Sequence, residues 1–458
     1  MKKESLSVFE EQSVAKAAQK MMLPTILSSL VMVLYSVTDT YFVGMLNDEI
    51  QSATVSLVSP VLISFNIANN LFGIGASSMI SRGLGKKDYD TARKSASFGI
   101  YGSLIYGILF SLCCKVFLNP LLGILGAKQD TIYATGEYML WTVLFGAVPS
   151  ILNVVFAYLI RAEGNALHAS IGTMSGCLLN VILDPIFILP WGLHMGAAGA
   201  GLATFLSNLF ACLYYLVFIY IKREQSIIRL HPKYFTLKKD IVIGICSVGI
   251  PAAVQNLLNV TSVTVMNHFV SVYGSAAVAA VGIAQKVYMV PLQIAQGGTQ
   301  GIMPLISYNY TGKRPDRFEE AIRFATKLMI PSMVIVAVLG WIWAGSLTGL
   351  FIGDAEIIEY GKLFLRGFCA SMPFMLADFM AVGVFQSVGE ENRALVFALL
   401  RKIVFEIPAI FLLNAVFHEY GITYAGFISE SILAVCGAVM VRRIIRNFRK
   451  QVAEVPPA

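Results

Sequence analysis

The sequence has 458 residues, a length that would give a soluble protein about three domains of roughly 150 residues each. Charged residues make up 13%, about half of the usual share of roughly 25%, whereas hydrophobic residues make up 57% and the mean hydropathy is +0.71. No water-soluble fold covers so much apolar side chain with so little charge. The composition therefore excludes soluble enzymes, nucleic-acid-binding proteins and disordered proteins, and it predicts an all-α integral membrane protein.

Residues 1–20 precede the first apolar run and carry charges of both signs, without the pattern of a cleaved signal peptide. Val8, Phe9, Val14 and Ala18 make this segment amphipathic, so we expect a helix that lies on the cytoplasmic surface. The first apolar run is therefore expected to be a retained membrane span.

A membrane-spanning helix needs about 20 apolar residues to cross about 30 Å of hydrocarbon. The sequence contains twelve runs of this kind, which are continuous and do not alternate with the period of a transmembrane β-strand. Their expected bounds are 21–46, 53–81, 95–118, 132–160, 166–190, 198–221, 241–271, 276–310, 324–349, 357–386, 395–417 and 421–444. The fourth and the tenth runs are long enough for each to form two shorter pieces.

Lys and Arg are distributed unevenly between the two sets of loops. With the N-terminus inside, the cytoplasmic segments hold 29 of the 34 basic residues, and only Lys115 and Lys128 lie in loops of the opposite face. Cytoplasmic loops typically carry such an excess, so both termini are expected to be cytoplasmic. The net charge of +7 is then a consequence of topology, and it implies no nucleic-acid partner.

The longest hydrophilic stretch, residues 222–240, divides the chain into halves that resemble each other. Pro24 and Pro251 are 227 residues apart, and Gly85-Lys86-Lys87 matches Gly312-Lys313-Arg314 at the same offset. Offsets of 224 or 225 relate Pro149 to Pro373, Gly164 to Gly389, Gly196 to Gly421 and Ala200-Gly201 to Ala425-Gly426.

This repeat predicts two pseudo-symmetric bundles of six helices, related by an axis along the membrane normal. The expected domains are an amphipathic N-terminus (1–20), an N-lobe (21–221), a cytoplasmic linker (222–240), a C-lobe (241–444) and a cytoplasmic tail (445–458). Two matching halves that face one cavity are typical of alternating-access transporters.

The N-terminal half contains two carboxylates within spans, Asp39 and Asp184. A charged group costs at least ~2.5–3.5 kcal/mol at the centre of a span, so such residues usually have a function. Asn180 lies four residues before Asp184, so both lie on one helix face. Pro185 removes a backbone donor and leaves the carbonyl of Val181 without its helical partner.

These groups permit two kinds of chemistry. Carboxylate, amide and carbonyl oxygens together suit a hard cation such as Na⁺. Alternatively, apolar surroundings favour the protonated form of a carboxyl group, so Asp39 is a candidate proton carrier. Tyr35, one turn before Asp39 on the same face, is positioned to orient it. A purely structural role, in which both carboxylates only bond neighbouring helices, is the third interpretation.

Ionisable residues also lie within the spans of the C-terminal half, namely Lys286, Arg366, Asp378, Glu406 and Glu430. Lys286, Arg366 and Glu430 lie at similar depths from the outer ends of their spans, which predicts a buried ion network. In the alternative interpretation, Asp378 or Glu406 contributes to substrate or proton binding.

Two further residues bear on the transport path. Asn153 in the fourth span is expected to face a substrate cavity, with a helix-packing amide as the alternative. The position equivalent to Asp39 is Met266, so we do not expect the two halves to share one coupling mechanism.

The chain resembles the multidrug and toxic compound extrusion (MATE) family, in particular the bacterial drug exporters of its DinF-like branch. The resemblance covers roughly residues 10–450. It rests on the twelve spans, the 6+6 repeat and the following motifs: Pro24 fifteen residues before Asp39, Asn180-Val-Ile-Leu-Asp184-Pro185, Leu159-Ile-Arg161-Ala-Glu-Gly164-Asn, Gly196-Ala-Ala-Gly199-Ala-Gly-Leu-Ala-Thr204 and Val388-Gly389-Glu-Glu-Asn392.

The resemblance implies a V-shaped pair of lobes in a bacterial cytoplasmic membrane, the inner membrane where there are two. It implies a secondary active antiporter that exports drugs or other organic, often cationic, compounds in exchange for H⁺ or Na⁺. The family's cation-site residues correspond to Asp39, Asn180, Asp184 and Thr204, and a bound Na⁺ would lie there. The substrate cavity is expected to include Tyr35, Asn153, Asp378 and Glu406.

The alternative function is that of a lipid-linked oligosaccharide flippase of the same superfamily. An acidic N-lobe disfavours a pyrophosphate-bearing substrate. A membrane-embedded enzyme is disfavoured because no HExxH, DDxxD or GxSxG motif is present. We therefore expect a transporter with no cofactor besides its coupling ion, acting as a monomer in the lipid bilayer.

Overall fold

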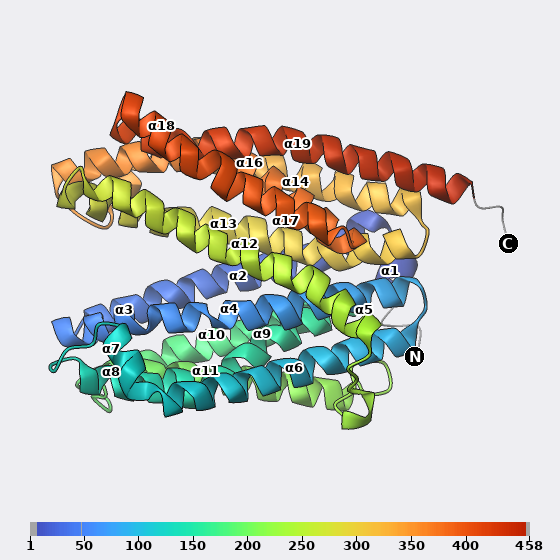
Figure 1. The fold of residues 1–458 in the computed structure, drawn as a ribbon, viewed down its shortest axis with the longest axis horizontal. Helices are drawn as coiled ribbons and strands as arrows, with labels where there is room; N and C mark the ends of the chain where they lie inside the picture. The colour runs from blue at the N-terminus through green and yellow to red at the C-terminus, as the bar shows by residue number, and fades with distance from the viewer. Residues whose placement is uncertain (1–6, 47, 455–458) are drawn as a thin grey trace. The chain divides into compact units, whose positions relative to one another are not determined.

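The computed structural model describes residues 7–46 and 48–454. The remaining residues, which include the beginning of the expected amphipathic N-terminus and the end of the expected tail, lie outside the described residues. All regular structure in the described part of the chain is helical (Figure 1). This confirms the expected fold class.

Each of the twelve apolar runs forms a helix or a row of helices. The N-terminal half contains α2 (Val14–Gly44), α3 (Glu49–Ile63), α4 (Phe65–Ala68), η1 (Asn69–Ile74), α5 (Gly75–Gly85), α6 (Tyr89–Val116), α8 (Ile132–Met139), η2 (Leu140–Phe145), α9 (Ala147–Ala162), α10 (Ala166–Ile188) and α11 (Ala197–Ile221). The C-terminal half contains α12 (Lys239–Ser271), α13 (Ser275–Thr311), α14 (Pro315–Ile342), α16 (Ala355–Val388), α17 (Glu391–Leu399), η4 (Leu400–Glu406), α18 (Ile407–Phe417) and α19 (Glu419–Ala453). The elements η1, η2 and η4 are π-helical.

In the described part of the chain, ten helices are long and apolar enough to span a membrane, or eleven if one bent pair is a single span. The bent pair is the fourth run, in which Ile132–Phe145 and Ala147–Ala162 meet at 45°. The run from α17 to α18 falls outside this count, because it is interrupted by the charged residues Arg401, Lys402 and Glu406.

The two long runs behave differently. The fourth is bent at Gly146, where an added Cβ would lie 2.4 Å from the carbonyl oxygen of Thr142, so only glycine permits this close approach. The tenth, α16, is one continuous helix that contains Pro373. The alternative of two shorter pieces therefore applies to the fourth run and does not apply to the tenth, which continues through this proline.

The N-terminal segment differs from the expected surface helix. A short helix, α1 (Ser7–Glu10), is followed by α2, which begins at Val14 and continues into the first span. Val14, Ala17 and Ala18 are buried. Their burial explains the difference, because these apolar residues pack inside the protein rather than against a membrane surface.

The chain forms two compact units, whose bounds differ from the expected lobes. Unit 1 comprises residues 1–11 and 27–253, and unit 2 comprises residues 12–26 and 254–458. The beginning of α2 thus belongs to unit 2, and the beginning of α12 belongs to unit 1. Both helices change units at positions 227 residues apart, the offset that relates Pro24 to Pro251.

Close backbone contacts hold the exchanged segments in place. An added Cβ on Gly75 in unit 1 would lie 2.4 Å from the carbonyl oxygen of Ile245 on α12. In unit 2, an added Cβ on Gly301 would lie 2.8 Å from the Cα of Met22 on α2. Glycine in these places allows the exchanged helix to approach its neighbour backbone to backbone.

The repeat also appears in short elements, although its offset drifts. The short helices α7 (Leu118–Ile124) and α15 (Ala344–Gly349) follow equivalent spans, and Lys87 and Lys313 share a positive φ, of 60° and 54°. Near the end of the chain, the expected match of Gly196 with Gly421 is shifted by three residues. Gly196 (φ 57°, ψ −136°) corresponds in backbone conformation to His418 (φ 55°, ψ −136°), and each precedes the last helix of its half.

We expect His418→Gly to raise the free energy of unfolding by about 1 kcal/mol. The backbone of His418 has a positive φ, a conformation that glycine adopts without strain. For other residues this conformation costs roughly 1–3 kcal/mol. Thermal denaturation of the purified protein measures the effect. His418→Ala keeps the strain and serves as the control, so an equal gain in both variants would contradict this explanation.

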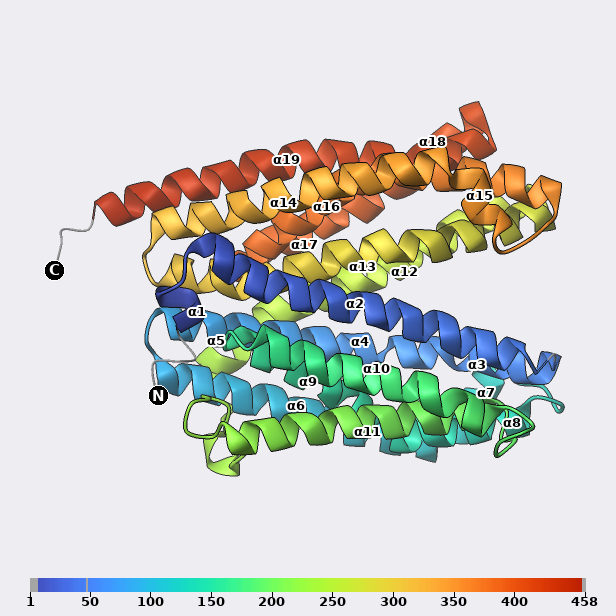
Figure 2. The same ribbon diagram turned by 180° about the vertical axis from the view of Figure 1, so that it is seen from behind.

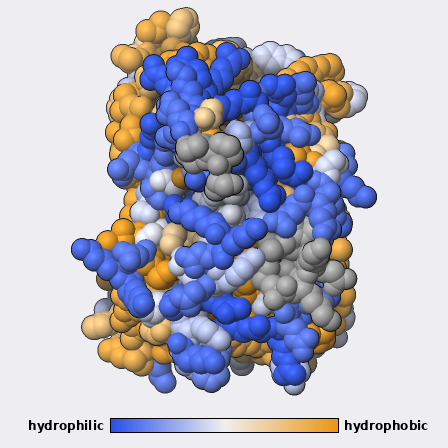
Figure 3. Space-filling view, turned by 90° about the vertical axis from the view of Figure 1, so that its right-hand side faces the viewer, coloured by the Kyte–Doolittle hydropathy of each residue, from blue (hydrophilic) through white to orange (hydrophobic). Residues whose placement is uncertain are grey.

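In each unit the hydrophilic turns gather at one end of the helices. These are the α5–α6 turn and the segment after α11 in unit 1, and the α13–α14 turn and the end of α19 in unit 2 (Figures 1 and 2). Figure 3 looks onto these ends, where hydrophilic side chains cover most of the surface and hydrophobic ones lie at its margins.

The segment after α11 is held to unit 1 by Glu163, which follows α9 and is 3% exposed. Its carboxylate accepts hydrogen bonds from Ser226 Oγ at 2.8 Å and from the backbone nitrogens of Ile227 and Ile228 at 2.6 and 3.0 Å. Burial raises the pKa of Glu163 to about 7, although these hydrogen bonds act in the opposite direction.

This shift predicts a pH-dependent stability. The pKa of Glu163 is raised from 4.5 to about 7 in the folded protein, so the folded state holds the proton more tightly than the unfolded state. The contribution of protonated Glu163 to the free energy of unfolding is therefore complete below about pH 4.5 and is lost as the pH rises through 7. We expect the free energy of unfolding to decrease by up to about 3 kcal/mol between about pH 5 and pH 8, and the melting temperature to decrease with it. The variant Glu163→Gln is expected to lose most of this pH dependence. Thermal denaturation at both pH values measures it, with the exposed Glu224→Gln as control. Equal slopes in wild type and Glu163→Gln would refute the assignment.

Candidate cation-coupling site

The four residues expected to bind the coupling cation all belong to unit 1. Asp39 lies in α2, Asn180 and Asp184 lie one turn apart in α10, and Thr204 lies in α11, which packs against α10. Asn180 is 1% exposed and Asp184 is fully buried. Two of the residues therefore form a polar pair within an apolar helix bundle.

Hydrogen bonds join α10 to α11 at this pair. In the amide orientation that satisfies both of its polar atoms, Asn180 donates from Nδ2 to Asp184 Oδ2 at 2.9 Å and accepts from the Thr204 backbone nitrogen at 3.1 Å. The hydroxyl groups of Tyr35 and Thr204 lie 3.4 Å apart. The structure thus connects Tyr35, Thr204, Asn180 and Asp184 in one network, in which Asp184 already has a hydrogen-bond donor.

One carboxylate oxygen of Asp39 lacks such a donor. Its Oδ1 is buried and has no hydrogen-bond partner among the described residues. The charge of Asp39 also acts on Asp184 and on the Tyr35 hydroxyl. A buried carboxylate oxygen without a donor is costly unless a proton or a cation satisfies it.

The donor set fits a small hard cation, because it consists of carboxylate, amide, hydroxyl and carbonyl oxygens. Pro185 lies inside α10, so the carbonyl of Val181 lacks its usual helical donor there. The same set also accommodates a proton on Asp39.

Sequence reasoning missed Tyr138 as a neighbour of this site. Tyr138 lies at the end of α8, next to the π-helical turn η2, and is 5% exposed. It lies within electrostatic range of both Asp39 and Asp184. No spacing pattern in the sequence links it to these residues, because its place at the site depends on the packing of α8 against α11.

Asn153 lies in a second amide network of unit 1. Its Nδ2 donates to Asn208 Oδ1 at 2.8 Å, and Asn208 Nδ2 donates in turn to Ser150 Oγ at 3.1 Å and to the Thr204 carbonyl at 2.9 Å. Asn153 thereby joins α9 to the turn of α11 that carries Thr204. This arrangement corresponds to the helix-packing alternative.

The buried charges of unit 2 have different partners from those expected. Arg401 is 3% exposed, donates to Asn259 Oδ1 at 2.6 Å and lies 3.9 Å from Glu430 Oε1. Asp378 is fully buried and interacts with both Glu430 and Arg401. Arg401 lies in the eleventh apolar run, 395–417, and is one of the 29 basic residues assigned to the cytoplasmic side, whereas the structure buries it inside the helix bundle.

The expected network of Lys286, Arg366 and Glu430 is therefore wrong. Lys286 is exposed, and Arg366 contacts the ring and the carbonyl of Trp341. The π-helical turn η4 brings Arg401 to Glu430 instead. Similar depth in three spans did not identify the helix faces that meet.

Glu406 lies in a second charged group of unit 2. It pairs with Lys402 at 2.5 Å and accepts a hydrogen bond from Ser262. Glu406, Lys402 and Glu430 line a cavity of about 120 Å³ together with Tyr288. The structure thus places Glu406 at a cavity and Asp378 in the adjoining ion cluster.

This fold and site define a class, the multi-pass helical membrane transporters. The MatE family model matches residues 24–186 and again residues 251–412. The two matches begin at the prolines that relate the halves, so the internal duplication is confirmed. The chain belongs to the MatE family, as the resemblance predicted.

Named relatives agree with this assignment. Multidrug export protein MepA of Staphylococcus aureus (strain MRSA252) is 32% identical over 445 residues, and the alignment covers 96% of each chain. The protein of the same name from Staphylococcus saprophyticus is 31% identical over 442 residues, again with 96% of each chain covered. These relatives confirm that the chain is a transporter and not an enzyme.

Solved structures show the same fold. A multidrug resistance MATE family transporter of the MOP superfamily, in an outward-facing conformation, matches with a TM-score of 0.91 at 23% identity and covers 98% of this chain and 99% of its own. A MOP superfamily transporter from Pyrococcus furiosus matches with a TM-score of 0.89 at 22% identity, with 97% of this chain and 99% of its own covered.

Proposed function

We propose that this protein is a secondary active antiporter that exports organic, often cationic, drugs in exchange for H⁺ or Na⁺ by alternating access. The names of the MepA relatives support multidrug export. The observation that carries the coupling mechanism is the buried Oδ1 of Asp39, which has no donor among the described residues.

The residues of unit 1 have distinct roles in this mechanism. Asp39 holds the proton or cation, while Asn180 keeps Asp184 oriented and Tyr35 and Thr204 supply hydroxyl oxygens. Inward movement of one cation across 100 mV releases about 2.3 kcal/mol, which drives export of the substrate. Ion binding from outside favours the conformation that releases the drug, because each ligand shifts the equilibrium by its differential affinity for the two states.

The proposal includes a location and an oligomeric state. The Staphylococcus relatives support a bacterial cytoplasmic membrane. The excess of Lys and Arg in the turns at one end of each unit (Figure 1) supports a cytoplasmic location for both termini. Both matches of the family model lie in one chain, which supports a monomer in the bilayer as the transporting form.

Ethidium efflux from proteoliposomes tests this function. Purified protein is reconstituted, and an imposed pH gradient is compared with an imposed sodium gradient. Efflux driven by the pH gradient alone identifies H⁺ as the coupling ion, and sodium-dependent efflux identifies Na⁺. Absence of efflux under both gradients would refute drug antiport and favour the flippase alternative.

A further inference from the structure

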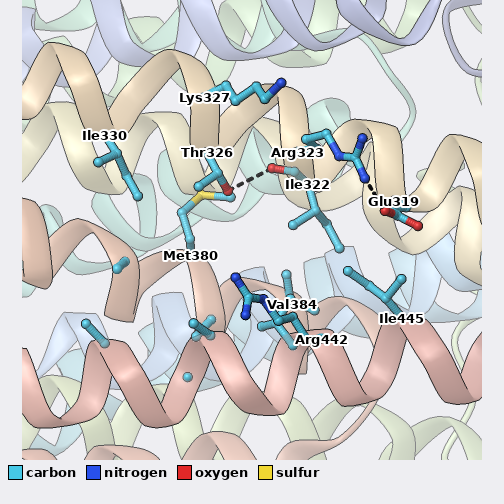
Figure 4. Close-up of a pocket in the computed structure, with 16 residues that line it drawn as sticks. Glu319, Ile322, Arg323, Thr326, Lys327, Ile330, Met380, Val384, Arg442 and Ile445 are labelled. Atoms are coloured by element: carbon cyan, nitrogen blue, oxygen red, sulfur yellow. Dashed lines mark hydrogen bonds and ion pairs between the residues drawn. The ribbon is translucent and has the colours of Figure 1, made fainter.

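Unit 2 contains a groove of about 400 Å³ between α14, α16 and α19, which Figure 4 shows in close-up. This volume lies within the range of roughly 300–1,000 Å³ typical of sites for organic molecules, so it exceeds the needs of an ion. Small residues create the space. Gly437 lets α19 approach α16, since an added Cβ would lie 2.9 Å from that of Ala381, and Ala434 and Ala438 leave the wall open.

The groove changes from charged to apolar along its length. In Figure 4, Glu319 and Ile445 lie at one end and Ile330 lies at the other. Lys327 is the last charge of α14 before the apolar residues 328–342, and Arg442 follows the uncharged residues 431–441 of α19. The two basic side chains therefore come from facing helices at the border between a polar end and an apolar span.

The charges at the polar end leave a net positive potential. Glu319, the one acidic residue that lines the groove in the described chain, is paired with Arg323 at 2.5 Å and with Arg449 at 2.9 Å. Lys327 and Arg442 are exposed and make no hydrogen bond or ion pair with any described residue. An organic cation is disfavoured here, whereas the two exposed basic side chains on opposite walls of the groove (Figure 4) favour an anionic ligand.

We propose that this groove binds an anionic phospholipid, with its phosphate between Lys327 and Arg442 and an acyl chain along Ile330, Met380 and Val384. Basic pockets between membrane helices on the cytoplasmic side suit anionic head groups, and the apolar wall suits a lipid tail. Both parts of the lipid are needed, because the basic pair borders the apolar span directly. This site is separate from the cation-coupling residues of unit 1.

Titration of the full-length protein in detergent with dioctanoyl phosphatidylglycerol tests the site, with native mass spectrometry as the readout. Dioctanoyl phosphatidylcholine and free glycerol phosphate distinguish the contributions of charge and tail. We expect the double variant Lys327→Gln/Arg442→Gln to bind phosphatidylglycerol about 30-fold more weakly. Ala438→Phe fills the apolar wall and is expected to weaken binding without a change in charge.

The matched control is Arg443→Gln/Arg446→Gln, which removes two charges from the same end of α19 outside the groove. It is expected to bind phosphatidylglycerol within twofold of wild type. Three results would each overturn the proposal: an equal loss in the control, binding of glycerol phosphate as tight as that of the lipid, or binding of phosphatidylcholine as tight as that of phosphatidylglycerol.

Discussion

Replacing Asp39 with Asn is expected to reduce gradient-driven ethidium efflux at least tenfold, while the amount of folded protein stays unchanged. Asparagine keeps the size of the side chain but can neither take up a proton nor supply a charged ligand for Na⁺. The buried Oδ1 then has no exchangeable partner, so the gradient no longer drives transport. Initial efflux rates from proteoliposomes measure the effect.

The control is Asp90→Asn, which removes a surface carboxylate of α6 that pairs with Lys94. Its efflux is expected to stay within twofold of the wild-type rate. Binding of ethidium to Asp39→Asn, measured without a gradient, separates lost coupling from lost substrate binding. Wild-type efflux in Asp39→Asn would exclude the carboxylate mechanism.

Replacing Arg401 with Met is expected to destabilise unit 2 by about 3–5 kcal/mol, the usual cost of removing one partner of a buried ion pair. Methionine fills much of the volume, but it removes the arginine that lies beside the buried acidic groups of Glu430 and Asp378, and among the described residues only Lys402 remains as a positive neighbour. The same change removes the donor to Asn259. Thermal and chemical denaturation of the purified protein measure the loss.

A second change distinguishes charge from packing. Adding Glu430→Gln to Arg401→Met neutralises one orphaned carboxylate and is expected to restore part of the stability. Arg393→Met, which removes an exposed arginine of α17, is expected to change stability by at most about 0.5 kcal/mol. If Arg401→Met changed the stability as little as Arg393→Met, the ion cluster would not contribute to the stability of unit 2.

The helices and the duplication were predictable from the sequence, because long apolar runs and repeated Pro and Gly positions depend on local chemistry. The polar pair of α10 was predictable for the same reason, since Asn180 and Asp184 are four residues apart. The pairing of Glu430 with Arg401 was not predictable, because the spacing of charges does not reveal that the π-helical turn η4 directs Arg401 toward Glu430.

The exact equivalence of positions in the two halves was also not predictable from the sequence. Gly421 is a plausible match for Gly196 by spacing, yet the backbone assigns that role to His418. A shift of three residues moves a position to the next turn of a helix, and sequence similarity alone does not detect it. The positions in α2 and α12 at which the chain passes from one unit to the other were not predictable either. A continuous apolar run does not show where a helix begins to pack against a different set of helices.

The exchange of helix segments between the units constrains the order in which the chain matures during synthesis. Unit 1 remains incomplete until residue 253 has been made, although most of its helices are finished long before. Residues 12–26 are among the first to be made, yet they join a unit whose other residues begin at 254. A chain that ends after the first half therefore leaves residues 12–26 without the unit they pack in, and it lacks the beginning of α12 that completes unit 1. Neither half of the sequence is then a self-sufficient folding unit.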